Sequence, residues 1–265
     1  MVLRALISLT LVGCAPSRSA DPGGALKLDP PVTRLESGGL RLEEQAWSLG
    51  DSHGTAWRVS VPLPGHASVS ATPSVVAFSE LLPADTGPWA AINGGFYDTD
   101  KAAMGLVVSG GTERAPLRPS GGSGVFFWAP TGPHVVHRDA WAPGPPEAVQ
   151  SIDRLVDQGK SVVGHLDGPL AARSAVAVGR ARLWIVALSA AEGIHPVDGG
   201  VQLDHTVAHG LSLGRFAEYL LQSTDTVEAL NLDGAGSTQL SVRTPEGAFA
   251  LRGERGTINA VVLRP

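Results

Sequence analysis

The feature that most constrains the fold is the interruption of short apolar runs by glycine and proline. The chain holds 33 glycines and 20 prolines among 265 residues. The apolar run Trp89–Ile92 leads directly into Asn93-Gly94-Gly95, and Gly124–Ala129 ends at Pro130. Such punctuation favours many short elements joined by turns. Only 17% of the residues are charged, which argues against long charged helices and coiled coils.

Eight segments have the length and composition of strands. They are Ala56–Val61, Pro88–Asn93, Met104–Ser109, Gly124–Ala129, Ser174–Val178, Ala181–Leu188, Ala229–Leu232 and Ala260–Leu263. Gly179 lies between the fifth and sixth of these, which predicts a hairpin.

Helical spacing is rarer along the chain. Ala148–Gln158 places Val149, Ile152, Leu155 and Val156 on one face and predicts a helix. Ser212–Gln222 predicts a second, with Ser212 as its N-cap.

Ser74–Leu82 fits either a short helix or a strand followed by a turn. Because strands outnumber helices and are joined by short turns, we expect an α+β fold. This would be a single domain over residues 32–265, with a mixed, largely antiparallel sheet and a few flanking helices.

The N-terminus has the pattern of an export signal. Arg4 precedes a short apolar stretch, Ala5–Val12, which is too short to span a bilayer. Leu11–Cys14 resembles a bacterial lipobox and contains the one cysteine of the sequence. We therefore predict a lipoprotein signal over residues 1–14, lipidation of Cys14 and a flexible tether over residues 15–31. The alternative is an ordinary secretory signal with a chance cysteine.

These features predict an extracytoplasmic protein, held to a membrane at the periplasm or the cell surface. The formal net charge is −5. Nucleic acid is therefore not the expected partner, because phosphate backbones require a basic surface.

Two strand ends share a glycine-rich pattern. The first reads AAINGGFYD (Ala90–Asp98) and the second ALNLDGAGST (Ala229–Thr238). Glycine lets a ligand approach the backbone closely, and successive N–H groups in such turns can bind an anion. Asp233 would present its carboxylate at the mouth of the second turn. Each segment alone also fits an ordinary turn.

Four blocks in order give this pattern its specificity. They are AINGGFYD with MGLVVSGG, then ARSAVAV, then GLSLGRFAEYLLQ with ALNLDGAGSTQL, and finally GERGTINAVVL. Together they resemble the phosphodiester glycosidase family over about Trp57–Leu263. Family members hydrolyse a sugar-1-phosphodiester, such as one carrying N-acetylglucosamine, to the sugar and a phosphomonoester. The family's Asn-Leu-Asp-Gly-Gly-Gly-Ser turn has Ala235 here in place of its middle glycine.

The resemblance implies three catalytic residues. Asp233 would attack the anomeric carbon or activate water, Arg173 would clamp the phosphate, and Asn93 would orient the sugar or the carboxylate. The implied substrate-binding residues are Gly94, Gly95, Phe96, Tyr97, Asp98, Gly234, Gly236, Ser237, Thr238, Glu254 and Arg255. Neither a cofactor nor a metal is expected.

A competing metal site involves the segment DHTVAH. His205 and His209 are four residues apart, with Asp204 adjacent and His195 upstream. On a helix this spacing suits zinc. Thr206 and Val207 are poor helix formers, however, and no Glu follows His205.

We therefore expect an exported hydrolase that cleaves the C1–O bond of a carbohydrate phosphodiester in envelope or exopolysaccharide material. Two alternatives remain open. One is a glycan-binding lipoprotein without turnover, and the other is a metal-dependent phosphodiesterase that cleaves the P–O bond.

Overall fold

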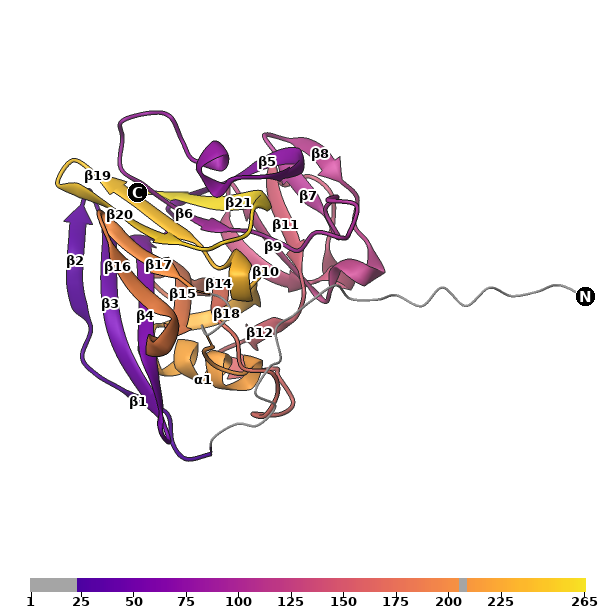
Figure 1. Ribbon diagram of the computed structural model, residues 1–265. Coiled ribbons are helices and arrows are strands. Elements are labelled where there is room, and N and C mark those ends of the chain that lie inside the picture. The colour runs from indigo at the N-terminus through magenta and orange to yellow at the C-terminus, as the bar shows by residue number, and fades with distance from the viewer. Residues whose placement is uncertain (1–22, 205–208) are drawn as a thin grey trace, which may run out of the picture.

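The computed structural model describes residues 23–204 and 209–265, and within them it contains twenty-one strands and a single α-helix (Figure 1). The strands form three sheets of nine, seven and five strands. All strand pairs in these residues are antiparallel except β17 with β20. Cys14 and the rest of residues 1–22 lie outside the described part, as does His205.

The nine-stranded sheet has the order β1-β3-β4-β15-β14-β18-β12-β13, with β2 paired to β3. Its strands are β1 (Lys27–Leu28), β2 (Val32–Ser37), β3 (Leu40–Leu49), β4 (Ser52–Pro62), β12 (Arg154–Asp157), β13 (Lys160–Ser161), β14 (Arg173–Gly179), β15 (Arg182–Ala190) and β18 (Thr226–Asn231). Leu26, beside β1, is buried in the core on this sheet, so the end of the 15–31 segment packs against the domain.

The seven-stranded sheet has the order β16-β17-β20-β19-β6-β21-β5. Its strands are β5 (His66–Val76), β6 (Trp89–Asn93), β16 (Ile194–Val197), β17 (Gly200–Leu203), β19 (Leu240–Thr244), β20 (Gly247–Arg252) and β21 (Thr257–Arg264). The five-stranded sheet, β10-β9-β11-β7-β8, contains β7 (Val107–Ser109), β8 (Thr112–Ala115), β9 (Gly124–Ala129), β10 (Gly132–His137) and β11 (Glu147–Ser151).

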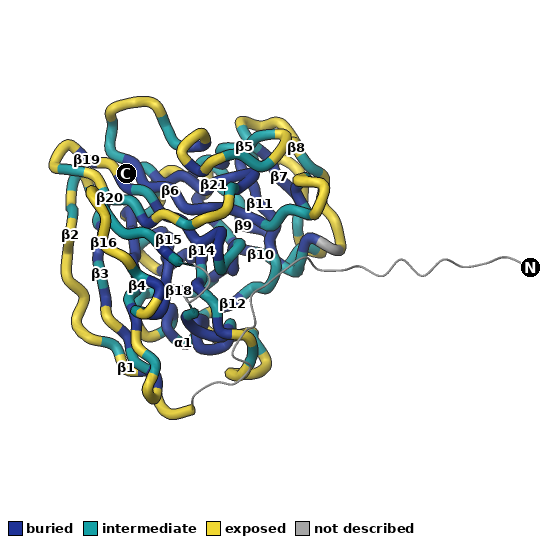
Figure 2. The backbone as a smooth tube through the Cα atoms, viewed as in Figure 1, coloured by how far each residue is buried: buried dark blue, intermediate teal, exposed yellow. Residues whose placement is uncertain are grey.

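The main core fills the space between the nine- and seven-stranded sheets. Val59 and Ile185 of the former and Ile92 and Val261 of the latter are completely buried in one cluster. Ala56, three residues before Val59 in β4, points the other way, into a second cluster beneath α1. Side chains alternate between the two faces of a strand, so the central strands are buried on both sides (Figure 2).

The helix α1 (Leu213–Ser223) confirms the predicted helix and its cap. The Ser212 hydroxyl accepts a hydrogen bond from the Arg215 backbone N–H at 3.3 Å, which satisfies one free donor of the first turn. Phe216, Tyr219 and Leu220 of α1 are completely buried against the nine-stranded sheet.

The predicted α+β class is wrong, because the structure is mostly β. The expected helix over Ala148–Gln158 consists of β11 and β12, which belong to different sheets. Its apolar residues resemble a helical face because all five residues of β11 are buried. Asp153 and Gln158 have positive φ angles of 63° and 50°, which interrupt the segment. Ser74–Leu82 is the end of β5 followed by a 3₁₀ helix, Phe78–Leu81.

The five 3₁₀ helices of the described residues are Phe78–Leu81, Pro119–Gly121, Arg138–Ala140, Ala191–Gly193 and Ala235–Ser237. No helix in this part of the chain is long and apolar enough to cross a membrane.

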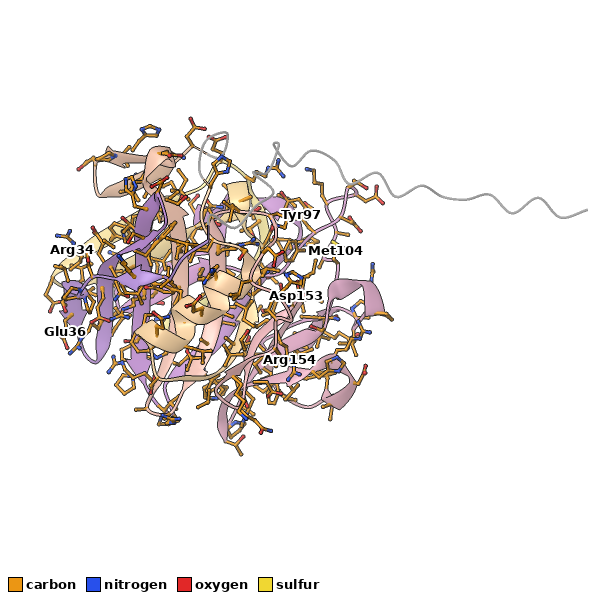
Figure 3. All side chains as sticks on the ribbon, turned by 90° about the horizontal axis from the view of Figure 1, so that it is seen from below. Arg34, Glu36, Tyr97, Met104, Asp153 and Arg154 are labelled. Carbon is orange, nitrogen blue, oxygen red and sulfur yellow. The ribbon has the colours of Figure 1, made fainter. Side chains whose placement is uncertain are left out.

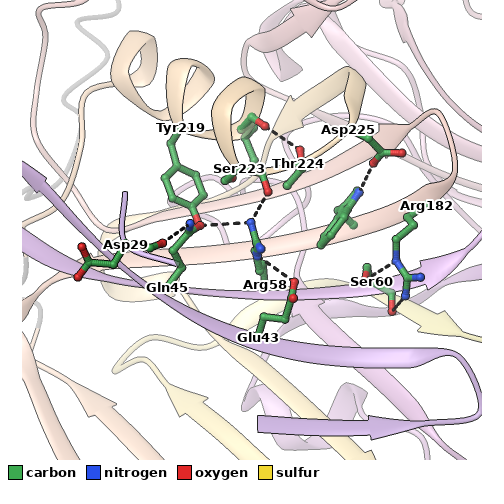
Figure 4. Close-up of polar contacts among 12 residues, drawn as sticks. Asp29, Glu43, Gln45, Arg58, Ser60, Arg182, Tyr219, Ser223, Thr224 and Asp225 are labelled. Carbon is green, nitrogen blue, oxygen red and sulfur yellow. Dashed lines mark hydrogen bonds and ion pairs between the residues drawn. The ribbon is translucent and has the colours of Figure 1, made fainter. Parts of the chain in front are cut away.

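A buried polar network ties α1 to the sheet (Figure 4). Arg58 of β4 pairs with Glu43 of β3 at 3.0 Å and also donates to Gln45 Oε1 and to the Ser223 carbonyl. The Tyr219 hydroxyl donates to the same Gln45 oxygen at 2.8 Å. The side chains of Arg58 and Glu43 are 6% and 10% exposed, so each depends on the other for charge compensation.

We predict that Glu43→Leu lowers the free energy of unfolding by roughly 3–5 kcal/mol, because it leaves the Arg58 charge buried without its carboxylate. The double variant Glu43→Leu/Arg58→Met should recover most of that loss. Urea unfolding measures both. A single variant as stable as the wild type would show that this ion pair is not needed to balance the buried charge.

Candidate active site

Two strand ends that are far apart in sequence meet at the candidate site. The Asp233 N–H, after β18, donates to the Gly94 carbonyl, after β6, at 2.9 Å. The Asn93 side-chain amide donates to the Asp233 carbonyl at 2.6 Å, across 140 residues of sequence. The two glycine-rich turns therefore lie against each other, at the place where the nine- and seven-stranded sheets touch.

The Asn93 amide is fully engaged by the protein. Its Oδ1 accepts from the Ser174 hydroxyl at 2.8 Å and from the Gln239 N–H at 3.0 Å. Asn93 and Ser174 are both completely buried. Asn93 therefore acts on Asp233 through the backbone, as a positioning residue, because its Nδ2 donates to the Asp233 carbonyl and both bonds to its Oδ1 come from the protein.

The strand register places Arg173 beside Asp233. Ala175 of β14 pairs with Asn231 of β18. The pairing continues beyond the end of β18, because the Leu232 N–H donates to the Ser174 carbonyl at 2.8 Å. The Ala235 N–H donates to the Ala172 carbonyl at 2.9 Å, so Arg173 lies between two residues that hydrogen-bond to the Asp233 turn. The Arg173 side chain reaches the segment just before α1, where it donates to the Leu211 carbonyl at 2.8 Å.

Burial raises the pKa of Asp233 to about 6. Hydrogen bonds from the Ser237 side chain and the Gly234 N–H, and the positive charge of Arg255, act in the opposite direction. The Gly234 N–H donates to Asp233 Oδ1 at 2.9 Å. Asp233 is thus a desolvated carboxylate that is ionised at neutral pH and gains a proton on mild acidification.

Arg173 is a half-buried cation that lacks an ion-pair partner in the described residues. Burial lowers the pKa of its guanidinium to about 10, and the charge of Asp153 opposes that shift. Nε donates to the Leu211 carbonyl at 2.8 Å and Nη2 to the Pro169 carbonyl at 2.6 Å. These neutral acceptors hold the group in place without neutralising it, and it remains charged at neutral pH. A half-buried, fixed positive charge is suited to an anionic ligand.

The first turn needs glycine because other groups approach it closely. A Cβ at Gly94 would lie 1.8 Å from Asn259 Oδ1, and one at Gly95 would lie 2.6 Å from the Gln150 carbonyl. The Gly94 and Gly95 N–H groups donate to the carbonyl and the side chain of Asn259, both at 2.8 Å. Neither N–H is available to form an anion-binding nest.

The second turn packs against the C-terminal block. The Gly236 carbonyl accepts from the Glu254 and Arg255 N–H groups, each at 3.0 Å. Gly236, Ser237 and Thr238 are buried, whereas Glu254 and Arg255 are exposed. Arg255 thus lies at the solvent side of the Asp233 turn, where its charge reaches the carboxylate.

The other predicted binding residues lie further along the first loop. Asp98 Oδ1 accepts from the Asp100 and Ala102 N–H groups, both at 3.0 Å, so this carboxylate stabilises its own turn. Phe96 and Tyr97 (Figure 3) are half-buried, and Tyr97 packs with Ala103, its bridge partner.

The structure also brings two residues to the site that the sequence analysis did not select. The Asn231 N–H donates to the Asp153 carbonyl at 3.1 Å. Asn231 could have been selected from the sequence as a site residue, because it stands two residues before Asp233 in the alternating run Asn-Leu-Asp and so shares its face. Asp153 was hidden within the segment interpreted as a helix.

Of the histidines in the competing metal hypothesis, His195 and His209 lie in the described residues. His195 is exposed on β16, and the His209 carbonyl accepts from the Ala190 N–H at 2.9 Å. In the described part of the chain, no three His, Cys, Asp or Glu side chains are grouped closely enough to hold a metal ion.

Ala235 adopts the left-handed conformation, with φ of 52°. This conformation costs an L-residue roughly 1–2 kcal/mol, and glycine avoids that cost. We predict that Ala235→Gly raises the free energy of unfolding by about 0.5–1 kcal/mol, after allowing for the entropy of glycine in the unfolded chain.

Ala171→Gly is the matched control, because Ala171 does not have a positive φ; it should lower stability by about 0.5–1 kcal/mol. Thermal unfolding of both variants gives the comparison. Equal destabilisation by the two substitutions would contradict strain at Ala235.

Comparison with solved structures supports this architecture. The chain is 17% identical to the zebrafish N-acetylglucosamine-1-phosphodiester alpha-N-acetylglucosaminidase catalytic domain, which is auto-inhibited by its pro-peptide; the TM-score is 0.57, covering 91% of this chain and 88% of that one. A Synechocystis hypothetical protein is also 17% identical, with a TM-score of 0.59, covering 89% of this chain and 64% of that one. At these identities the likeness shows a common fold.

No curated protein matches the sequence. The model of the phosphodiester glycosidase family matches residues 86–264. That range covers more than half of the chain and contains Asn93, Arg173 and Asp233. The chain therefore belongs to the phosphodiester glycosidase family.

Proposed function

We propose that this protein hydrolyses a sugar-1-phosphodiester at its C1–O bond. The observation that supports the proposal is that the chain at Arg173, a half-buried guanidinium without a carboxylate partner in the described residues, lies against the turn that carries Asp233. A phosphodiester glycoside presents a phosphate anion one bond from an anomeric carbon. The two side chains match these two chemical groups.

The reaction divides between the two residues. Arg173 binds the phosphate and stabilises the charge that builds on it as the C1–O bond breaks. The phosphate leaves as a stable anion, so it needs little protonation. Asp233 either takes a proton from the water that attacks C1, or attacks C1 itself to form a glycosyl ester that water then cleaves. The bridging oxygen stays on the phosphate in both routes.

The surroundings of Asp233 suit this role. Its backbone is held on both sides, by Gly94 through its N–H and by Asn93 through its carbonyl. The position of the carboxylate is therefore set before a substrate arrives, which reduces the entropy lost on reaching the reactive geometry. Arg255, exposed beside the same turn, could supply a second contact to the phosphate.

We also propose where the protein acts. The export signal and Cys14 favour a lipid-anchored protein acting on envelope or exopolysaccharide material. The sugar would be one that carries a phosphodiester at C1, as in the N-acetylglucosamine phosphodiesters named for the zebrafish relative.

We predict that Asp233→Asn reduces the release of sugar from UDP-N-acetylglucosamine at least a thousandfold, because the amide can neither attack C1 nor accept a proton. Asp100→Asn, an exposed change of the same charge, should behave as the wild type. Sugar release by the purified protein, with and without EDTA, gives the measurement. Binding of the nucleotide sugar without release would favour a glycan-binding protein, and loss of activity in EDTA would favour a metal-dependent phosphodiesterase.

The pH profile tests the same residue independently. If ionised Asp233 is the reactive form, kcat/KM should rise with pH up to about 6 and then level off. A profile that falls with increasing pH across this range would instead require the protonated carboxyl.

A further inference from the structure

Asp153 adopts a backbone conformation that is rare for its residue type. It precedes β12, is half-buried, and has φ of 63°. Asp and Asn tolerate the left-handed region better than most residues, but glycine avoids the strain. Strained residues of this kind concentrate at functional sites. Asp153 is labelled in Figure 3, beside its neighbour Arg154.

The sheet brings Asp153 to the candidate site. The strands β14, β18 and β12 are adjacent in the nine-stranded sheet. The Asp153 carbonyl accepts from the Asn231 N–H at 3.1 Å, so Asp153 stands opposite Asn231. Asp233 is two residues beyond Asn231, in a diagonal position that places side chains about 7–8 Å apart. Arg173 follows on the other side of Asp233.

In the described residues, no oppositely charged group is in direct contact with the Asp153 carboxylate. No hydrogen bond or ion pair involves its carboxylate there, and its neighbour Arg154 pairs with Asp157 at 3.2 Å instead. The Asp153 charge acts on Arg173, where it raises the pKa of the guanidinium against the effect of burial. The charged groups on the surrounding elements are Arg154 and Asp157 on β12, Lys160 on β13, Arg173 on β14, Glu228 on β18, Asp233 after β18, Arg255 before β21, and Arg215 and Glu218 on α1. The Glu228 carboxylate accepts from the Val135 N–H at 2.7 Å.

We propose that Asp153 is a specificity residue that makes the phosphate site favour singly charged phosphodiesters over doubly charged phosphomonoesters. This inference rests on the proposed function, in which Arg173 holds the phosphate. The substrate then carries one negative charge and the phosphomonoester product up to two. Asp153 repels the second charge and so promotes release of the product.

The size of the effect follows from Coulomb's law. One extra unit charge about 7–8 Å from a carboxylate, at an effective dielectric constant near 20, changes binding by roughly 30- to 50-fold. Asp153 is half-buried, so screening by solvent and salt reduces this to about tenfold. Asp153 repels the one negative charge of a diester and both negative charges of a fully ionised monoester. Removing the Asp153 charge should therefore change the ratio of the two affinities by about tenfold.

The test uses two probes that are not hydrolysed at a sugar carbon, methyl phosphate and dimethyl phosphate. Their dissociation constants are measured by NMR titration of the wild type and of Asp153→Asn, a variant of equal size that tolerates the same φ. At pH 8 the substitution should lower the dissociation constant of methyl phosphate about ten times more than it lowers that of dimethyl phosphate. At pH 5, where both probes carry one charge, the ratio of their dissociation constants should equal that of the wild type.

Asp157→Asn is the matched control, because it removes the same charge from the same strand. It should leave the ratio unchanged at both pH values. Asp153→Gly, which suits φ of 63°, replaces Asp153→Asn if that variant does not fold. An unchanged ratio at pH 8 would overturn the inference, as would an equal change at pH 5 or failure of either probe to bind.

The binding readout separates the two proposals. If the ratio shifts as expected while sugar phosphodiesters are not hydrolysed, the proposed reaction fails and the phosphate selectivity stands. If sugar is released while the ratio does not shift, Asp153 has no such role and the reaction stands.

Discussion

The candidate site depends on one buried amide. Asn93 is completely buried at the end of β6, and its side chain bonds to Asp233, Ser174 and Gln239. A buried amide left without partners is expensive, whereas one with every partner in place specifies a single arrangement. Through these bonds the ends of the seven- and nine-stranded sheets are fixed to each other. Asp233 and Arg173 acquire their relative positions from that junction.

The same junction places an ionisable group where folding disfavours its charge. The pKa of Asp233 is about 6 in the folded protein, against 3.8 for the unperturbed group. The folded state therefore binds the proton more tightly than the unfolded state does. The stability gained from the protonated form is fully present below about 3.8 and is lost as pH rises through about 6, a loss of roughly 2–3 kcal/mol. Stability given up at a reactive group is characteristic of functional sites.

The two glycine-rich strand ends were easier to recognise in the sequence than the fold class was. The strand ends at Asn93 and Asp233 were recognisable because apolar runs stop there at Gly-Gly and Asp-Gly. The helix after Ser212 was recognisable from its cap and its apolar face. Ala148–Gln158 was wrongly predicted to be a helix, because a fully buried strand carries apolar residues on both faces and this pattern overlaps with helical spacing.

Other features were not accessible from the sequence for physical reasons. The amide of Asn93 was expected to orient either the sugar or the Asp233 carboxylate, and only the three-dimensional arrangement shows that it bonds to the Asp233 backbone carbonyl. The left-handed backbone at Asp153 and Ala235 depends on long-range packing, which the local sequence does not reveal. The approach of Asp153 to Arg173 requires the strand order β14-β18-β12. These strands are not consecutive along the chain, so the sequence does not show that they are neighbours in the sheet.

The central claim is that the protein breaks the bond between the anomeric carbon and oxygen, with the phosphate held at Arg173. Hydrolysis of UDP-N-acetylglucosamine in ¹⁸O-labelled water, followed by mass spectrometry of both products, tests it most directly. The account predicts the label on C1 of the released sugar and none in the phosphate. Label in the phosphate would show that the P–O bond is cleaved, and would contradict the assignment of Asp233 to the anomeric carbon.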